Sequence, residues 1–382
     1  MISNRFCVCM PFMGSESIGG SHISAALLAR ELIKRGIDVR MVVHKVESEV
    51  ERFFIKKGLR IIVLPLPRFG SKRMAEDEHS LPVWAIFKLL RYIKRQNISL
   101  VHTHSFRVHF VWALACQLSG IKHIWHVRGY FPSKFPGRFK LLFSHAFISI
   151  SRYVSSGAPF FIRRRVFEID NPFDSKVFPA GTACRRKLLL DCHVQEPVSL
   201  VLFGGRLDEP RKRALFFAQV SKLVRIQTRI PVAFLVFGEG SEQTVRAMRE
   251  IFGLDDECSC LRFLGFRDPL HEVMSAADIV VCPAVDEPFG RLLVEAMLAG
   301  TTVIASRSGA HPEIVEHEKT GFLVDADNVE QMQVAIIKLL QDGAVREQLA
   351  KNGWAYAQGR FAVEKHVDQV LSIYRNVLSA GN

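Results

Sequence analysis

Short apolar segments alternate along this chain with longer segments in which apolar residues recur every three or four positions. The first apolar segment, residues 6–10, predicts a buried strand, and a loop then reaches Gly20 before a helix over residues 21–35. Gly36 ends that helix, and residues 38–43 return to a strand pattern. A strand, a glycine loop, a helix and a second strand form a βαβ unit, which implies parallel strands with helices packed on the sheet.

The same rhythm continues along the chain and falls into two blocks. In the first block we expect further strands at residues 60–64, 100–102 and 121–126, and a helix over residues 81–94. In the second block the expected strands are 199–203, 232–237, 261–264, 279–282 and 302–305, with helices at 214–228, 243–252, 270–276 and 291–299.

A polar stretch over residues 174–186 separates the two blocks. We therefore expect a first domain over residues 1–180, a second over 181–360, and a closing amphipathic helix in 361–382 that packs back toward the first domain. Each block fits a doubly wound, Rossmann-like α/β domain, in which ligands bind at the carboxyl ends of the strands. Two such crevices facing an interdomain cleft would hold a donor and an acceptor from opposite sides, which suits group transfer.

Length and composition are those of a globular protein. The chain has 382 residues, of which 48% are hydrophobic and 23% charged. Its longest apolar runs, such as 108–116, are far shorter than the roughly 20 residues that a membrane-spanning helix needs, and no secretory signal pattern is evident at the start. Cys7/Cys9 and Cys258/Cys260 lack the Cys-x-x-Cys spacing of a zinc site, so we expect reduced thiols in the cytosol.

The net charge of +13 is concentrated in the first half of the chain. Residues 1–183 carry 28 Lys and Arg against 12 Asp and Glu, whereas residues 184–382 carry 23 against 26. Such a basic half indicates an anionic partner: membrane phospholipid, nucleic acid or a phosphorylated substrate. A solvated surface with no partner is the alternative.

Two glutamates, Glu287 and Glu295, lie eight residues apart around the start of a predicted helix. Pro288 and Gly290 mark a turn, and the apolar spacing that follows predicts the helix. The amide groups at a helix start attract phosphate. Glu287 in the turn, and Glu295 about one helical turn into the helix, can accept hydrogen bonds from ligand hydroxyl groups. This combination suits a nucleotide sugar.

Two cations, Arg206 and Lys212, follow the strand at 199–203. They could neutralise a diphosphate without a metal, and loop cations in water are the alternative. Gly265 also follows a strand, where glycines commonly line a nucleoside pocket and ordinary turns are equally common. The Gly19-Gly20 pair would let the backbone approach a phosphate, although a plain turn fits it as well; it is not the G-x-G-x-x-G fingerprint of dinucleotide binding.

Several histidines lie at or near strand ends in the basic half: His102, His104, His109, His123 and His126. His102 and His104 could suggest a metal, but no third ligand of suitable spacing is evident in the sequence. His126 is the last residue of the strand expected at 121–126 and is better placed to face the crevice. A structural role in the core is the alternative for each of them.

These motifs together resemble a known family, the retaining glycosyltransferases of the GT-B type, family 4, or glycosyl transferases group 1. The spacing from Glu287 to Glu295 matches the family's E-x7-E element. The other matching segments of the second half are Gly205-Arg206, Lys212, 238–240, 263–265, 309–313 and 321–324. The first half, with Gly19-Gly20, resembles the family more loosely.

The resemblance implies roles for the candidate residues of the second half. Arg206 and Lys212 would bind the donor diphosphate, Glu287 the transferred sugar and Glu295 the ribose hydroxyl groups, while Gly265 would lie in the nucleoside pocket. Backbone amides at the turn would contact sugar and phosphate: Phe289, Gly290, Arg291 and Leu292.

In the first half the resemblance implies that Gly20 closes over the β-phosphate and that His126 lies near the sugar and the acceptor. The implied catalytic set is Glu287, His126, Lys212 and Arg206. Residues 308–313 match a loop that usually reads Gly-x-x-Glu, and no role follows for them from the resemblance.

The implied reaction transfers a hexose-type sugar from a UDP- or GDP-sugar with retention at the anomeric carbon. No Asp-x-Asp is placed to hold a metal, because Asp325-Ala326-Asp327 follows the motif region. We therefore expect no metal or other cofactor. Glu287 has no obvious acidic partner, so same-face attack is favoured over a double displacement.

The acceptor expected from the basic half is a glycan or a lipid-linked molecule in cell-surface polysaccharide, lipopolysaccharide or glycolipid biosynthesis. Interleaved basic and aromatic residues suit an anionic bilayer, so we expect peripheral attachment to the inner face of the cytoplasmic membrane. The alternative is that the apolar residues pack on the sheet and the cations are solvated. The residues concerned lie in three segments: Arg52–Arg73 with Phe53, Phe54 and Phe69; Trp84–Arg95 with Phe87, Leu90 and Ile93; and Phe131–Lys140 with Phe135 and Phe139.

Two other functions remain open from the sequence. One is a nucleotide-sugar epimerase of similar architecture. The other is a nucleic-acid-binding protein that uses the basic half; no helix-turn-helix, zinc finger or RNA-binding signature supports it, so we expect no nucleic-acid partner.

Overall fold

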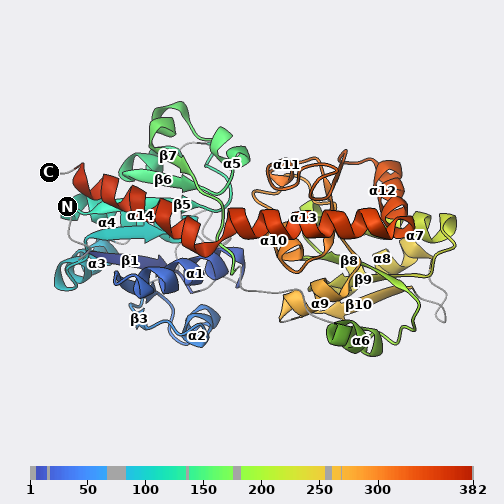
Figure 1. Ribbon diagram of the computed structural model, residues 1–382. Coiled ribbons are helices and arrows are strands. Elements are labelled where there is room, and N and C mark those ends of the chain that lie inside the picture. Colours follow the sequence, from blue (N-terminus) through green and yellow to red (C-terminus); the bar gives the residue numbers. More distant parts are fainter. Residues whose placement is uncertain are drawn as a thin grey trace. The chain divides into compact units, whose positions relative to one another are not determined.

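The computed structural model describes residues 6–14, 18–66, 83–134, 137–174, 182–253, 260–267 and 269–380. The chain divides into two compact units (Figure 1). The first unit contains Met1–Phe173 and Val363–Asn382, and the second contains Asp174–Ala362. Each unit is described below by itself.

The described residues of the first unit form a seven-stranded sheet in the order β3-β2-β1-β4-β5-β6-β7, with every pairing parallel. This confirms the parallel sheet expected from the βαβ pattern. The strands are β1 (Cys7–Phe12), β2 (Asp38–Val43), β3 (Ile61–Val63), β4 (Leu100–Thr103), β5 (Lys122–Val127), β6 (Ala146–Ser149) and β7 (Val166–Glu168).

Strand β1 explains why the first strand reads as an unbroken apolar run. Val8 and Met10 pack into the cluster of helices α1 and α14, whereas Cys7 and Cys9 pack into the cluster of α3 and α4. Both faces of a doubly wound sheet are covered, so both sets of side chains must be apolar. Burial raises the pKa of the Cys7 thiol to about 12, which makes it an unreactive core thiol.

The helices of this unit begin and end at residues typical of their positions. Ser48 caps α2 by accepting a hydrogen bond from the Glu51 amide, and Gly120 ends α4 in the left-handed region. The α-helices are α1 (Gly20–Lys34), α2 (Glu49–Lys56), α3 (Val83–Arg95), α4 (Phe106–Ser119), α5 (Arg152–Ser156) and α14 (Val363–Ser379), with 3-10 helices η2 (Phe139–Phe143) and η3 (Phe160–Arg165).

The closing helix α14 belongs to the core of the first unit. It packs against α1, and Val367, Val370 and Tyr374 are fully buried there (Figure 1). The Tyr374 hydroxyl lies 2.6 Å from Nδ1 of His102 on β4. The last helix therefore contacts both the first helix and the central strands of this unit.

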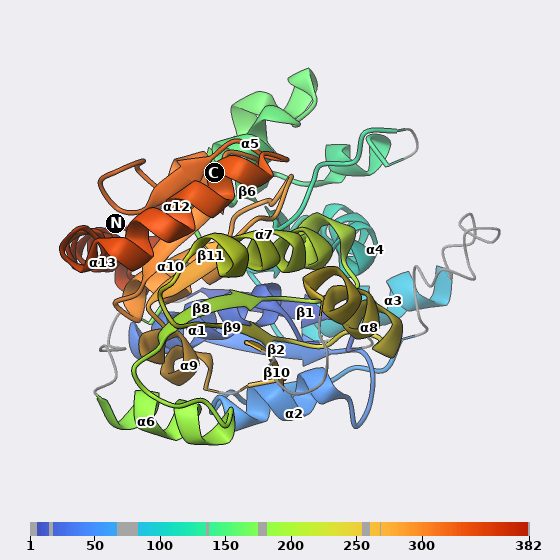
Figure 2. The same cartoon turned by 90° about the vertical axis from the view of Figure 1, so that its right-hand side faces the viewer.

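The described residues of the second unit form a parallel sheet in the order β10-β9-β8-β11-β12-β13. Helix α7 packs against both α8 and α12 (Figure 2). The strands are β8 (Ser199–Gly204), β9 (Val232–Phe237), β10 (Leu261–Gly265), β11 (Ile279–Cys282), β12 (Thr302–Ser306) and β13 (Phe322–Val324). The helices are α6 (Thr182–Asp191), η4 (Pro210–Lys212), α7 (Ala214–Gln227), α8 (Glu242–Phe252), α9 (Leu270–Ala276), α10 (Arg291–Leu298), α11 (His311–Ile314), α12 (Val329–Gln341) and α13 (Gly343–Phe361).

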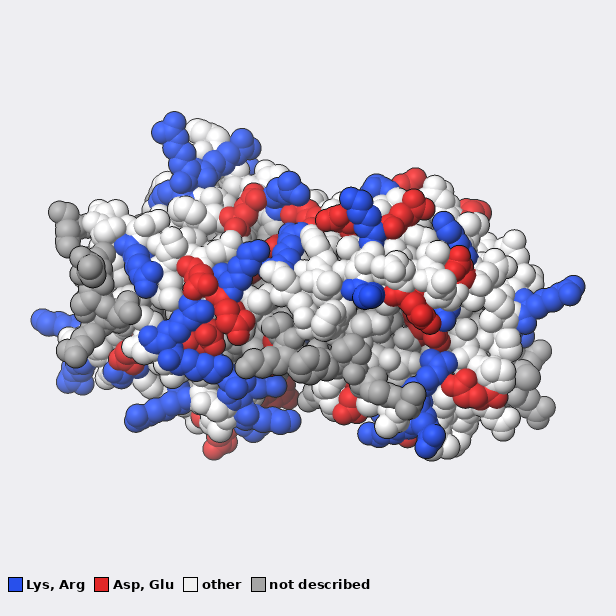
Figure 3. All heavy atoms as spheres, viewed as in Figure 1, with Lys and Arg blue, Asp and Glu red and all other residues white. Residues whose placement is uncertain are grey.

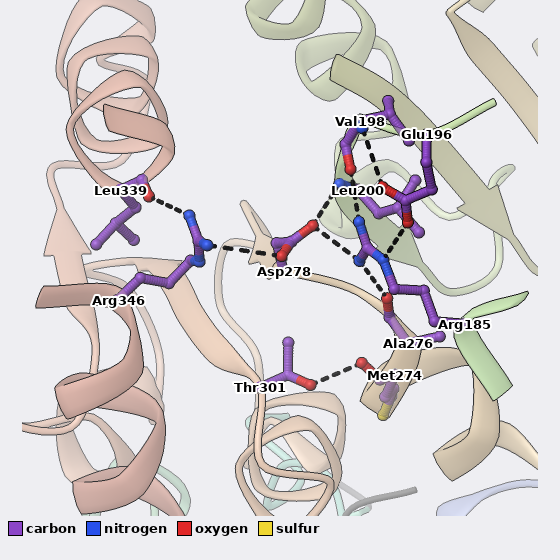
Figure 4. A network of polar contacts seen from close by, with 10 residues as sticks. All are labelled: Arg185, Glu196, Val198, Leu200, Met274, Ala276, Asp278, Thr301, Leu339 and Arg346. Carbon is purple, nitrogen blue, oxygen red and sulfur yellow. Dashed lines mark hydrogen bonds and ion pairs between the residues drawn. The ribbon is translucent and has the colours of Figure 1, made fainter. Parts of the chain in front are cut away.

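Asp278, just before β11, joins three parts of the second unit (Figure 4). Its carboxylate accepts hydrogen bonds from the Leu200 amide on β8 at 2.7 Å and from Arg185 on α6 at 3.1 Å, and Arg346 on α13 lies 3.7 Å away. Two cations and a backbone donor compensate the desolvation of this carboxylate. The network fixes β8 and β11 at the end opposite to the one where the candidate residues lie.

The fold class expected from the sequence is confirmed: two parallel-sheet, Rossmann-like units. No helix within the described ranges is both long enough and apolar enough to cross a membrane.

Candidate functional site

Apart from Gly265, which ends β10, the candidate residues of the second unit follow the carboxyl ends of two neighbouring strands, β8 and β11. The loop after β8 carries Arg206 and Lys212, and the loop after β11 carries Glu287 and leads into α10. Parallel strands end at the same edge of a sheet, so residues far apart in the sequence meet here.

Lys212 and Glu287 form an ion pair in which Nζ donates to Oε2 at 2.8 Å. The two side chains are 24% and 15% exposed, so the pair is largely removed from water. The aliphatic stem of Lys212 lies over Gly205, where a Cβ would stand 3.3 Å from Cδ of Lys212. The lysine is thereby directed toward the glutamate.

Hydrogen bonds to backbone carbonyl groups hold the two loops against each other. The Val285 amide donates to the Arg211 carbonyl at 2.9 Å, and a guanidinium nitrogen of Arg211 donates to the Asp286 carbonyl at 3.3 Å. These bonds lie directly beside Lys212 and Glu287. The position of the ion pair is therefore set by the backbone as well as by the two side chains.

A third loop, after β12, forms hydrogen bonds with the backbone of Asp286 and Glu287. The Ala310 amide donates to the Glu287 carbonyl at 2.9 Å, and Ser308 Oγ accepts from the Asp286 amide at 2.9 Å. Gly309 has φ +57°, and a Cβ there would lie 2.4 Å from the Glu287 amide nitrogen. Only glycine fits so close to that backbone.

A pocket opens between these three loops. Its lining combines the ion pair with the turn before α10 and the ring of His311, over a floor that includes Cys282. Burial raises the pKa of the Cys282 thiol far above its ordinary value, so this cysteine is an apolar floor and no nucleophile. The lining residues that matter below are Lys212, Glu287, Gly290, Leu292 and His311.

The remaining predicted donor residues have different surroundings. Glu295 accepts a hydrogen bond from Arg291, one helical turn earlier, at 2.9 Å. Phe289 is buried and its ring packs edge-on against Phe361, so it can reach a ligand only through its backbone. Arg206 is exposed, and Gly265 ends β10; neither lines the pocket.

In the first unit, Gly20 and His126 also lie near the carboxyl ends of strands. Gly20 is the first residue of α1, and the preceding Gly19 amide donates to His22 Nδ1 at 3.3 Å. His126, in β5, is fully buried. These two residues belong to the first unit and the donor residues to the second, so their predicted meeting at one site stays a prediction.

His126 completes a histidine cluster, which corrects one expectation from the sequence. Ring nitrogens of His102, His104 and His126 all lie within 4.8 Å of one another. A third histidine of suitable position therefore exists; it was missed because the neighbours are set by the pairing of β4 with β5, not by spacing along the chain.

The surroundings of this cluster do not fit a divalent metal. Arg128 donates to Nδ1 of His104 at 3.3 Å and to Nδ1 of His126 at 3.4 Å. A metal-bound histidine normally donates its second nitrogen to an acceptor, whereas here a cation donates to it. Burial and the Arg128 charge hold the pKa of both rings well below the ordinary value, so the cluster is a neutral, Arg128-linked part of the core.

Doubly wound units with cations, carboxylates and a helix start at their strand ends are typical of enzymes that bind phosphorylated ligands. The comparisons with known proteins identify the family. The family described as Glycosyl transferases group 1 matches residues 198–342, and Glycosyltransferase Family 4 matches residues 18–162. The chain belongs to these group 1, family 4 glycosyltransferases, and its fold class is GT-B.

Relatives of known name differ in what they act on. A phosphatidyl-myo-inositol mannosyltransferase of Mycolicibacterium smegmatis is 34% identical over 206 residues, which is 50% of this chain and 49% of that protein. The match thus spans about half the length of that relative. An N-acetyl-alpha-D-glucosaminyl L-malate synthase of Bacillus anthracis is 21% identical over 382 residues, covering 95% of each chain.

Solved structures agree with the fold. HepE of Anabaena, in complex with UDP and glucose, has a TM-score of 0.80 at 20% identity, covering 97% of this chain and 100% of that one. A glycosyltransferase of Rickettsia africae has a TM-score of 0.81 at 16% identity, covering 98% and 99%. At these identities the likeness is one of fold.

Proposed function

We propose that the protein transfers a hexose-type sugar from a nucleoside diphosphate sugar to a glycan or glycolipid acceptor, with retention of configuration. The observation that carries the proposal is the Lys212–Glu287 pair at the carboxyl ends of β8 and β11, beside the start of α10. A cation for phosphate and a carboxylate for hydroxyl groups stand next to each other in one pocket. Family membership and the UDP-glucose complex of HepE support the same donor class.

When the donor binds, its groups replace the Lys212–Glu287 contact. The diphosphate contacts Lys212 and Arg206, which lies in the exposed part of the loop, and a sugar hydroxyl group donates to Glu287. The first amide groups of α10 add the partial positive charge of a helix start. Glu295, one turn into α10, accepts hydrogen bonds from the ribose hydroxyl groups.

In the transfer step, the bond between the anomeric carbon and the diphosphate oxygen breaks while the acceptor oxygen bonds to the same carbon. Negative charge develops on the leaving diphosphate, where fixed cations and the helix start lower the barrier most. The acceptor proton passes to the departing phosphate oxygen on the same face. This route is metal-independent, because Lys212, Arg206 and α10 supply the positive charge.

Thermal unfolding in the presence of a panel of UDP- and GDP-sugars tests the donor class. A donor at about 100 times its dissociation constant should stabilise the protein by about 2.7 kcal/mol, or several degrees in the unfolding midpoint. Free sugars, which lack the diphosphate, serve as controls. A protein that no nucleotide sugar stabilises would contradict the proposal, and a donor converted without any acceptor would indicate an epimerase instead.

We also propose that the first unit binds the anionic inner face of the cytoplasmic membrane. Lysine and arginine side chains gather over the part of this unit that contains α2 (Figure 3), and α3 exposes Trp84 and Phe87 with 54% and 66% of their surfaces accessible. Phe160, in η3, is 82% exposed beside Arg163 and Arg164. Exposed aromatic rings beside cations suit the interface of an anionic bilayer.

Burial narrows the set of residues that support this proposal. Phe54, Ile93 and Phe131 were expected at the surface, but they are buried in the core because their helix and loop faces pack against the sheet. Some residues of these segments lie outside the described residues: Arg68, Phe69, Lys72, Arg73 and Phe135. The same holds for Cys258 of the Cys258/Cys260 pair.

Sedimentation with vesicles tests the membrane proposal. The protein should sediment with vesicles rich in anionic phospholipid at low salt and be released at high salt, because salt screens exposed charges. Trp84→Ser with Phe87→Ser should weaken binding, whereas Leu118→Ser, which alters a leucine 62% exposed on α4, should not. Absence of sedimentation at low salt would count against attachment.

A further inference from the structure

His311 lies in the wall of the donor pocket, although nothing in the resemblance assigns it a role. It is the first residue of α11 and falls at an unspecified position of the Gly309–Glu313 element. Only 1% of its surface is exposed, and its ring lines the same pocket as Lys212, Glu287 and Gly290. A buried imidazole that faces a ligand pocket can bind a ligand group directly.

Two contacts settle which ring nitrogen carries the proton. Nδ1 of His311 lies 3.1 Å from the Ser306 carbonyl oxygen and 3.3 Å from Ser306 Oγ. A carbonyl oxygen can only accept, so Nδ1 is the protonated nitrogen. Ser306 Oγ donates its own proton to the Ala284 carbonyl, which leaves it free to accept from the ring as well.

The other nitrogen, Nε2, is therefore a hydrogen-bond acceptor. Burial lowers the pKa of His311 to about 4, so the ring is neutral at pH 7 and Nε2 keeps its lone pair. Within the described part of the chain Nε2 has no hydrogen-bond partner, and it is not among the polar atoms sealed from solvent. The acceptor is thus open to the pocket.

Gly290 keeps this ring edge accessible. A Cβ at Gly290 would lie 2.9 Å from Cδ2 and 3.3 Å from Nε2 of His311. The backbone conformation there, with φ +102°, also favours glycine. Any larger residue at the turn would cover the nitrogen.

The size and the polar groups of the donor pocket determine which ligand group can bind beside His311. The cavity volume of about 20 Å³ is enough for roughly one water-sized group. The lone pair of His311 Nε2, next to the Glu287 carboxylate, would repel a phosphate oxygen, because a phosphate oxygen has no proton to donate at neutral pH. A hydroxyl group has the right size and supplies the missing proton.

We propose that His311 Nε2 accepts a hydrogen bond from one hydroxyl group of the transferred sugar, and that His311 is thereby a specificity-determining residue for the donor. This rests on the proposed function. A site built to bind a hydroxyl group rejects an analogue that lacks it, because the buried acceptor is then left unpaired. Donors whose sugar is deoxygenated or inverted at that carbon should be discriminated against through His311.

Two variants of His311 and one control test the proposal. His311→Leu removes the acceptor, and His311→Gln replaces it with an amide oxygen at a similar reach. His271→Leu, on α9 and outside the pocket, is the matched control. The measurements are kcat/KM for the preferred nucleotide sugar and for its deoxy and epimeric analogues, and the dissociation constant of the nucleoside diphosphate alone.

The expected result separates sugar recognition from diphosphate recognition. His311→Leu should lower kcat/KM for the preferred donor by about ten- to hundredfold and leave the less preferred analogues little changed, so that discrimination shrinks. Binding of the nucleoside diphosphate should stay within about twofold, and His311→Gln should restore part of the preference.

Unchanged discrimination in His311→Leu, or an equal loss of nucleoside diphosphate binding, would overturn the proposal. Failure of the wild-type protein to use any nucleotide sugar would instead overturn the proposed function itself. Unfolding midpoints of the three variants show whether the fold is kept.

Discussion

Replacing Lys212 with alanine is expected to lower the turnover number of sugar transfer by about 100- to 1000-fold, the usual effect of removing one fixed charge from a transition state. Among the described residues that line the pocket, Lys212 is the one Lys or Arg, and the amide groups of α10 cannot replace a full charge. The fold should survive, because the side chain is 24% exposed and its ion pair with Glu287 lies at the pocket and not in a hydrophobic core. Steady-state kinetics at saturating donor measures the effect.

Two matched variants make this result specific. Lys319→Ala removes the same charge from a side chain that is 76% exposed in the second unit, and it should leave turnover unchanged. Lys212→Arg keeps the charge but changes a stem that is fitted over Gly205, so an intermediate loss is expected. Near-normal turnover in Lys212→Ala would rule out the assigned role.

Mild acid is expected to destabilise the first unit strongly. Burial lowers the pKa of His44 to about 4 and those of His109 and His366 to about 3, and it holds the rings of the histidine cluster well below their ordinary pKa. As the pH falls below about 6.5, the unfolded chain takes up protons that the folded chain does not. Stability is therefore fully present above that pH and is lost progressively toward the folded-state pKa values.

The size of the effect follows from the number of such histidines. Each removes up to about 1.4 kcal/mol per pH unit, so His44, His109 and His366 alone remove up to about 4 kcal/mol per unit. The unfolding midpoint of this unit should fall by about 8 °C or more between pH 7 and pH 5.5. Tryptophan fluorescence measures it, because Trp112 and Trp125 are both buried in this unit.

A single substitution tests the cause. The ring of His109 is fully buried and stacks on Trp125 with centroids 4.1 Å apart. His109→Phe should keep the stacking and reduce the pH dependence by up to about 1.4 kcal/mol per unit. If the dependence is unchanged in this variant, burial of His109 is not one of its causes.

Several strands buried on both faces, such as β1 and β9, were predicted from the sequence, but the buried strands β6 and β13 were not. Helix α4 is covered by α3, β5 and η2, so its apolar residues surround it and leave no helical periodicity to detect. Strand β7 is a three-residue edge strand after an arginine run, too short for an alternating pattern. Parallel topology followed from the strand–helix alternation, because parallel strands need crossover connections.

The candidate site was predictable as a set of residues, but its contacts were not. Lys212 and Glu287 were singled out separately, and their pairing depends on β8 lying beside β11, an order that no local pattern encodes. Arg128 was missed for the same reason, because its histidine partners come from neighbouring strands. The one local signal for His311 was its place between Gly309 and Glu313, directly before Pro312.

The place of α14 in the first unit determines the order in which the chain can fold during synthesis. Residues 174–362 form a contiguous unit, which can close its core as soon as they have left the ribosome. The first unit is made earlier, yet its core lacks Val367, Val370 and Tyr374 until the last helix has been translated. Until then α14 cannot cover α1 and His102, so we expect the first unit to complete its core after the second.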